Sequence, residues 1–248
     1  MCKNAHKKCK LKHLLCVYIH YILKIEVNQR KESEMNISIL GTGNIGSGLA
    51  KTFAKTDHVI YLGSRNQATA QAKAKELNSE TTRPINGVAN AEAIEKSKVI
   101  FLAVPFDGAI DLLKEANVDL SDKIIVDVTN PLTDDFMNLT LGHSTSAAEE
   151  IQNAFPDAHV VKAFNTVFAQ ILHEGPNFGS QNVPVYVASD KECAQSAVMK
   201  LIEATGFDAI NTGVLKNARY LEPMAEMNIQ FGYVLGLGTQ IAPAWISR

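Results

Sequence analysis

The chain has 248 residues, of which 46% are hydrophobic, so it is long enough to bury a substantial core in one large domain. Residues 1–34 carry eight Lys and Arg against three Glu, which leaves 16 basic and 23 acidic side chains in residues 35–248. This acidic body lacks the basic face that nucleic-acid phosphates require, so the composition argues against a nucleic-acid partner.

The first 34 residues have a pattern of their own. Three cysteines recur every seven positions, each followed four positions later by a histidine: Cys2 and His6, Cys9 and His13, Cys16 and His20. Their spacing matches no zinc module, so we expect no metal site. An apolar run over residues 14–23 has no cleavage site after it and is too short and polar to span a membrane. We therefore expect a disordered or wrongly assigned leader ahead of Met35.

Cysteine usage indicates the compartment. Outside the leader the chain has a single cysteine, Cys193. One cysteine cannot form a disulfide framework, so we expect a reducing, cytoplasmic location and no membrane partner.

Residues 35–48 read as a strand, a glycine turn and a helix. The apolar run over residues 37–40 predicts a buried parallel strand, and the apolar residues after the turn recur at helical spacing. Between them lie Gly41, Gly43 and Gly46, placed as dinucleotide folds place glycine for a tight turn, close approach to a pyrophosphate and tight helix packing. The N-terminus of the helix offers N–H groups to phosphates. The stretch therefore predicts a nucleotide-binding site.

A second strand is expected over residues 58–62, and it is followed by Gly63, Ser64, Arg65 and Asn66. An NAD-binding enzyme places Asp or Glu at this point to bind the ribose hydroxyls. A guanidinium forks onto a 2′-phosphate and a serine hydroxyl donates to it, so this loop predicts NADP as the nucleotide.

The following segments alternate between helical and strand patterns. We expect helices over residues 68–77, 88–95, 109–115, 147–155, 167–172 and 191–204, and strands over residues 99–104, 123–128, 160–164, 185–188 and 208–211. Ser146 and Glu149 form a capping box at the start of one helix. Two strands end in proline-stiffened loops, at Pro105 and at Asn130-Pro131. Open α/β sheets bind ligands at this edge, so these loops are candidate site segments.

The C-terminal region ends in a further helix. Residues 223–236 are expected to form it, with Pro223 at its first turn and an apolar stripe along one face. The stripe consists of Met224, Met227, Phe231, Val234 and Leu235.

These elements predict an α/β fold, a Rossmann-like, doubly wound and mostly parallel sheet with a small C-terminal helical extension. Within it, residues 35–165 are expected to form the NADP-binding domain. Residues 166–248 are expected to continue the sheet and add helices.

Together the motifs resemble the NADPH-dependent deazaflavin (coenzyme F-420) reductase family, which is related to the oxidoreductase domain of the Steap metalloreductases. The resemblance runs from Met35 to about Gly236. It rests on the glycine turn, residues 63–66, 126–131 and 161–166, and the segment 217–223. It implies a Rossmann sheet that binds NADP, and a flat acceptor stacked near Pro105, Asn130 and Asn165.

With the resemblance added to the motifs, a full set of candidate cofactor-binding residues can be named. It consists of Gly41, Thr42, Gly43, Asn44, Ile45, Gly46, Ser64, Arg65, Asn66, Val104, Pro105, Asn130, Pro131 and Asn165. The resemblance and the apolar stripe of residues 224–235 lead us to expect a homodimer. A flavin or deazaflavin is expected as a dissociable co-substrate, because the chain has one dinucleotide fingerprint and no second phosphate cradle.

No catalytic residue is evident. The spacing of His58, His143, His159, His173, Cys193 and the acids suggests no nucleophile with its base, no paired carboxylates and no metal cluster. Hydride transfer between two stacked rings proceeds by placement, whereas a carbonyl substrate needs a proton donor, so a flavin-like acceptor is favoured.

We therefore expect an NADPH-dependent reductase that passes hydride to a flavin or deazaflavin, with ferric iron as a further acceptor. Two alternatives stay open. One is a non-catalytic NADP sensor, which could lose the acceptor pocket. The other is an imine or pyrroline reductase, which needs a longer helical C-terminal domain than the residues after Thr166 easily supply.

Overall fold

The computed structural model describes residues 34–246. Residues 35–246 belong to one compact unit. The expectations for the leader, including its Cys and His repeat, lie outside the described residues.

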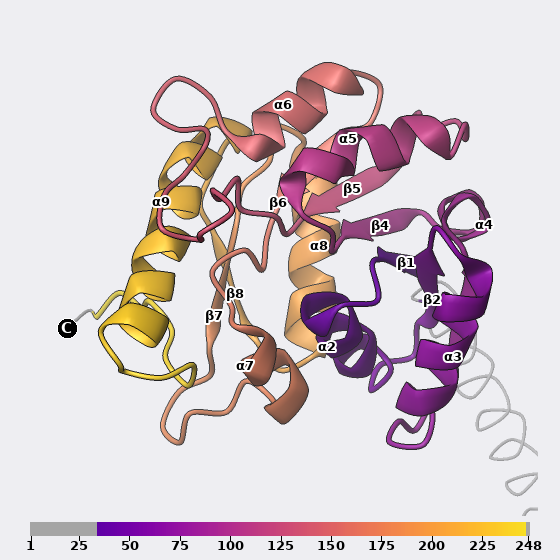
Figure 1. The fold of residues 1–248 in the computed structure, drawn as a ribbon, viewed down its shortest axis with the longest axis horizontal. Coiled ribbons are helices and arrows are strands. Elements are labelled where there is room, and N and C mark those ends of the chain that lie inside the picture. The colour runs from indigo at the N-terminus through magenta and orange to yellow at the C-terminus, as the bar shows by residue number, and fades with distance from the viewer. Residues whose placement is uncertain (1–33, 247–248) are drawn as a thin grey trace, which may run out of the picture. The chain divides into compact units, whose positions relative to one another are not determined.

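A six-stranded parallel sheet forms the centre of this unit (Figure 1). Its strands are β1 (Asn36–Leu40), β2 (Val59–Ser64), β3 (Ile85–Ala89), β4 (Val99–Leu102), β5 (Ile124–Asp127) and β6 (His159–Lys162). The spatial order is β3-β2-β1-β4-β5-β6, the order of doubly wound dinucleotide folds. The order reverses between β1 and β4, so the loops after these two strands diverge and leave a crevice at the carboxyl edge. The predicted fold class is confirmed.

Both faces of the sheet are covered by helices, because successive strand residues point to opposite faces and most of them are apolar. In β4, for example, Val99 and Phe101 enter one core and Ile100 and Leu102 enter the other. Residues of α2 (Asn44–Phe53), α3 (Gln67–Leu77), α7 (Ala169–Glu174) and α8 (Glu192–Ala204) belong to the first core. Residues of α4 (Asn90–Lys96), α5 (Phe106–Glu115) and α6 (Ala147–Ala154) belong to the second.

Strand β3 was not predicted. The sequence pattern favoured a helix over residues 88–95, but residues 85–89 are extended and the helix begins at Asn90. The strand pairs with β2 at the edge of the sheet, and the pairing compensates for the low strand propensity of Asn86 and Gly87. An added Cβ at Gly87 would lie 2.4 Å from the backbone oxygen of Ala70 in α3, so only glycine allows this close packing.

Strands β7 (Pro184–Val187) and β8 (Asp208–Asn211) form a separate parallel pair connected through α8. The expectation that residues 166–248 continue the main sheet is met only at one antiparallel bridge between Lys162 and Ala188. The reason is packing. Helix α8 buries its apolar side in the first core, and this places β7 across the end of β6 and not along it.

The last helix begins earlier than predicted. A 3-10 turn (Leu215–Asn217) leads into α9 (Ala218–Ile229), which ends in a π-helical turn (Gln230–Val234). Pro223 therefore lies inside the helix. Proline in a helix interior costs about 3 kcal/mol, and the burial of Leu215, Ala218 and Leu221 offsets this cost. Within residues 34–246, no helix is long and apolar enough to cross a bilayer.

Candidate functional site

The turn after β1 depends on two of its three glycines for steric reasons. Gly41 has a φ of 124°, and an added Cβ would lie 2.2 Å from the backbone oxygen of Ala103. At Gly46 an added Cβ would lie 1.9 Å from the backbone oxygen of Gly41. Real Cβ atoms never approach backbone so closely. The first and third glycines therefore allow the tight turn and the close packing of helix on strand that the motif predicts.

Gly43 has a different role. An added Cβ there would meet no atom within 4 Å, so the space in front of Gly43 is open. Gly43 is also the N-cap of α2, which has neither a side-chain cap nor an acidic residue in its first turn. The first N–H groups of a helix have no partners within the helix, and the helix dipole makes this end partly positive. The turn can therefore hold a pyrophosphate against the backbone of Thr42 to Gly46.

The loop after β2 presents a cation to solvent. Arg65 is exposed and forms no ion pair or hydrogen bond with any residue in the range 34–246. Its neighbour Asn66 is the N-cap of α3, because its side-chain oxygen accepts from the N–H of Ala68 at 2.9 Å. The hydroxyl of Ser64 is 3.4 Å from the N–H of Asn66. Arg65 and Ser64 are thus placed to meet a phosphate, whereas the Asn66 side chain has a structural task that was not predicted.

The loop after β4 lies beside the glycine turn, because Ala103 is the residue that Gly41 contacts. Val104 is half-buried and packs into the second core. Pro105 is exposed and is the N-cap of α5. Its flat ring is therefore presented at the carboxyl edge of the sheet.

The loops after β5 and β6 are joined by two asparagines. Asn130 donates from Nδ2 to the backbone oxygen of Asn165 at 2.9 Å, and Asn165 donates from Nδ2 to Oδ1 of Asn130 at 3.0 Å. Asn165 also donates to the backbone oxygen of Leu221 in α9 at 2.9 Å. Its own Oδ1 is buried and accepts no hydrogen bond from the described residues. The structure thus brings two predicted site residues together and leaves one acceptor for a bound molecule. Pro131, also predicted, is buried behind Asn130.

The backbone is strained directly before Asn165. Phe164 has a φ of 61°, which residues other than glycine rarely adopt and which costs about 1–3 kcal/mol. Its ring is buried in edge-on contact with Phe53, Phe101 and Phe207. These contacts hold Phe164 inward while the next residue turns to the carboxyl edge.

A buried cluster of charges lies behind the asparagine pair, and sequence analysis missed it. Lys162 Nζ is 2.8 Å from Asp127 Oδ2, 2.8 Å from Glu222 Oε1 and 2.6 Å from the backbone oxygen of Thr129. All three charged side chains are fully or almost fully buried. Burial opposes the charged form of Lys162, but the two carboxylates raise its pKa above the usual value. Burial raises the pKa of Glu222, against the attraction of Lys162.

The cluster is formed by residues from distant parts of the chain, so its spacing gave no signal. One signal did exist: Asp127 lies within the apolar run 124–128 and Lys162 within 160–164. A charge in a fully buried strand needs a partner. Glu222 is that partner for Lys162 and also accepts from the N–H of Ala147 at the start of α6.

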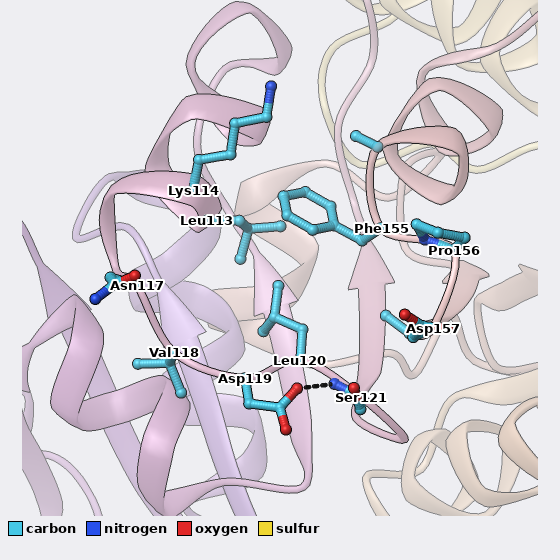
Figure 2. Close-up of a pocket in the computed structure, with 12 residues that line it drawn as sticks. Leu113, Lys114, Asn117, Val118, Asp119, Leu120, Ser121, Phe155, Pro156 and Asp157 are labelled. Atoms are coloured by element: carbon cyan, nitrogen blue, oxygen red, sulfur yellow. Dashed lines mark hydrogen bonds between the residues drawn. The ribbon is translucent and has the colours of Figure 1, made fainter.

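A hollow of about 460 Å³ lies at the amino ends of β5 and β6, opposite the carboxyl edge. Figure 2 shows the residues that line it. Leu120 and Ser121 line it just before β5, and Phe155 and Asp157 line it before β6. The Asp119 carboxylate turns to the N–H of Ser121 at 2.9 Å and not into the space. None of the predicted site residues lies there. A second hollow of about 360 Å³, lined by Met137, Leu139, Pro223, Glu226 and Met227 among others, adjoins the segment after Asn130.

The carboxyl edge therefore fits NADP on three structural grounds: a backbone cradle at Gly43, a guanidinium at Arg65 that has no partner within residues 34–246, and a buried acceptor oxygen on Asn165. Within the described part of the chain, no three His, Cys, Asp or Glu side chains are grouped to hold a metal ion.

Comparison with known proteins agrees with this geometry. Residues 36–131 match the family model described as NADP oxidoreductase, coenzyme F420-dependent. The F420-dependent NADP reductase of Methanocaldococcus jannaschii is 31% identical over 206 residues, which cover 79% of this chain and 91% of that protein. A solved structure from Arthrobacter sp. FB24, proposed to be an F420-dependent NADP reductase, has 28% identity and a TM-score of 0.73, over 84% of this chain and all of that one.

The rat metalloreductase STEAP3 is 32% identical over 186 residues, which are 75% of this chain but only 35% of STEAP3. The chain thus spans about a third of that relative. The likeness to the archaeal reductase covers nearly the whole of that enzyme. The chain therefore belongs to the family of coenzyme F420-dependent NADP oxidoreductases and is an NADP-dependent oxidoreductase.

Proposed function

We propose that the protein transfers a hydride between NADPH and a deazaflavin or flavin acceptor at the carboxyl edge of its sheet. One observation carries the proposal: the helix N-terminus at Gly43, the unpaired Arg65 and the hydrogen-bonded pair Asn130 and Asn165 all follow strands that end at this edge.

Each group has a distinct task in this proposal. The N–H groups of the first turn of α2 bind the pyrophosphate, and Arg65 with Ser64 binds the 2′-phosphate. NADPH supplies the hydride when it is bound. The side-chain oxygen of Asn165 accepts a hydrogen bond from an N–H of a bound ring, and Pro105 offers an apolar surface for stacking.

The proposed hydride acceptor is supported by the chemistry of the site and by similarity to named reductases. Among the candidate site residues at this edge, no side chain is a general acid, which a carbonyl substrate would need at its oxygen. A flavin-like ring reacts by placement next to the nicotinamide. The archaeal relative is named an F420-dependent NADP reductase, which supports a deazaflavin. The likeness to STEAP3, named a metalloreductase, supports ferric iron as an acceptor reached through a flavin.

The test follows the absorbance of NADPH with one acceptor at a time: coenzyme F420, FMN, FAD, a ferric chelate and a quinone. We expect turnover with F420 or FMN, and ferric reduction only when a flavin is added. The co-substrate should dissociate, so the purified protein should carry no stoichiometric flavin. Tight NADPH binding without turnover of any acceptor would instead favour the sensor.

The imine or pyrroline reductase stays the alternative enzyme. The described residues after β8 form a 3-10 turn, α9, a π-helical turn and the segment 235–246, which contains no regular helix or strand.

We also propose a homodimer that uses the outer side of α9 and its π-helical turn. Met224 is partly buried, but Met227, Phe231, Val234 and Leu235 are exposed, so most of the predicted stripe has no partner among the described residues. Sedimentation should show a dimer that Met227→Lys dissociates, whereas Val214→Lys, which changes an equally exposed side chain outside the stripe, leaves it intact. A monomeric wild-type protein would contradict this proposal.

A further inference from the structure

The cluster of Asp127, Lys162 and Glu222 buries three charged side chains at one point of the fold. A buried ion pair often contributes little net stability, because desolvation of the charges offsets their attraction. Here one cation and two carboxylates are buried together, and Lys162 Nζ has three acceptors at hydrogen-bonding distance. Such an arrangement can hold the backbone segments around it in a fixed orientation.

The cluster fixes the peptide group directly before Asn130. Asp127 Oδ1 accepts from the N–H of Thr129 at 2.9 Å, and Lys162 Nζ donates to the backbone oxygen of Thr129 at 2.6 Å. Both backbone polar groups of Thr129 are therefore held by cluster side chains. The oxygen of Thr129 belongs to the peptide bond that leads into Asn130, so Lys162 fixes the orientation of that bond.

The same cluster also adjoins two other segments, the one that bears Asn165 and the one that bears Leu221. Lys162 comes three residues before Asn165, separated by the strained Phe164. Glu222 directly follows Leu221, whose backbone oxygen accepts from Asn165 at 2.9 Å. One ionic cluster thus links the three segments that bear Asn130, Asn165 and the acceptor oxygen of Leu221.

We infer that Lys162 is a positioning residue, which acts through Asp127, Glu222 and the Thr129 carbonyl to hold Asn130 and Asn165 in register at the ligand edge. This inference rests on the proposed function only for the assignment of that edge to hydride transfer. Lys162 touches no ligand in this account, because its Nζ is fully buried and its three acceptors belong to the protein.

The direct test is the double variant Asp127→Asn with Lys162→Met. The wild-type cluster has one positive and two negative groups, so this variant keeps the net charge and leaves Glu222 at the N-terminus of α6, where negative charge is favoured. We expect kcat with F420 or FMN to fall at least tenfold. The dissociation constant of NADPH should stay within threefold, because Arg65 and the glycine turn are untouched.

Two further variants separate positioning from stability. Glu149→Gln removes an ion pair with Arg219 that joins the same two helices, α6 and α9, without touching Thr129. It should lower stability and leave kcat unchanged. Glu222→Gln keeps the contacts of Lys162 with Asp127 and Thr129 but removes its second carboxylate partner, so it should lower kcat, by less than the double variant does. If the double variant does not fold, the addition of Glu222→Gln removes the last buried charge.

Several results would overturn the inference. One is a folded double or triple variant whose kcat stays within twofold of wild type, and another is an equal loss of kcat in Glu149→Gln. If wild-type protein reduces no acceptor, the proposed function fails, and amide hydrogen exchange then decides the inference. Faster exchange of residues 128–133 and 163–167 in the double variant than in Glu149→Gln supports positioning, and equal exchange refutes it.

Discussion

The two ends of the ligand edge are built in different ways. At the β1 and β2 end, the groups that we assign to the nucleotide are backbone N–H groups at Gly43 and the side chain of Arg65, which has no partner among the described residues. At the β5 and β6 end, Asn130 and Asn165 are held by each other, by α9 and by a buried cluster. The phosphate-binding groups assigned to the first end lie within short stretches of chain, whereas the second end uses contacts between residues 33 to 60 positions apart.

The difference reflects two requirements, recognition of phosphates and precise placement of a hydride acceptor. Phosphates are recognised by charge and by open backbone, which a glycine turn supplies locally. A hydride acceptor must be placed within a few tenths of an ångström, and such precision needs groups locked from several sides. The family model match, which ends at Pro131, covers the first end and stops where the second begins.

The largest effect is expected at the glycine turn. Gly46→Val should destabilise the protein by about 3 kcal/mol, because the new side chain collides with the backbone oxygen of Gly41. Gly43→Ala is the matched control, since its methyl group meets no protein atom; it should keep the stability and lower NADPH affinity about tenfold. Urea unfolding and NADPH fluorescence titration measure both. Equal unfolding midpoints for the two variants would contradict the steric role of Gly46.

Arg65→Ala should test the nucleotide end alone, because it removes a charge from an exposed side chain without changing the fold. A charge-assisted hydrogen bond to the 2′-phosphate corresponds to roughly ten- to hundredfold in affinity. NADPH should therefore bind that much more weakly, with NADH unchanged. Arg83→Ala is the control, since this exposed arginine pairs with Asp57. Equal losses for NADPH and NADH would mean that Arg65 has a structural role.

At the other end, Asn130→Ala should lower kcat about tenfold and leave the NADPH dissociation constant within threefold. The truncation removes the partner that orients Asn165, whereas the nucleotide phosphates lie at the far end. Asn182→Ala, which removes a comparable partly buried side chain bonded to Asp208, should change neither value. An equal loss of NADPH affinity would mean that Asn130 contacts the nucleotide, and it would contradict the separation of the edge into a nucleotide end and an acceptor end.

The smallest effect concerns pH. Burial opposes the charge of Glu149, but bonds from Arg219 and Ser146 lower its pKa below the usual value. The contribution of Glu149 is therefore present above pH 4.5 and is lost as pH falls through the lowered value. Glu149→Gln should lower the Tm by at most about 2–4 °C at pH 7 and by less than that at pH 3. A constant difference at both pH values would rule out ionisation as the cause.

Much of the nucleotide end followed from sequence, because its signals are local. The turn of Gly41 to Gly46 and the cap of Ser146 on the N–H of Glu149 each lie within a few residues and have the predicted geometry. Arg65 lies exposed directly after β2, where the sequence placed it. The prolines and asparagines after the central strands were also identified, since strand ends are readable from apolar runs.

The errors share a cause in tertiary packing. Strand β3 has weak propensity and exists through its pairing with β2. Helix α9 continues across Pro223 because Ala218 and Leu221 are buried beneath it. Asn66 caps a helix, a role that depends on where α3 begins.

By itself, the sequence determined the doubly wound fold and predicted the nucleotide cradle and a preference for a 2′-phosphate, because each depends on glycine, apolar period or charge within a short stretch. Only the tertiary structure decided that Asp127, Lys162 and Glu222 meet behind the asparagine pair. Such a meeting is set by the order of the strands and by the path of α9, and a buried charge shows its partner only when the chain has folded around it.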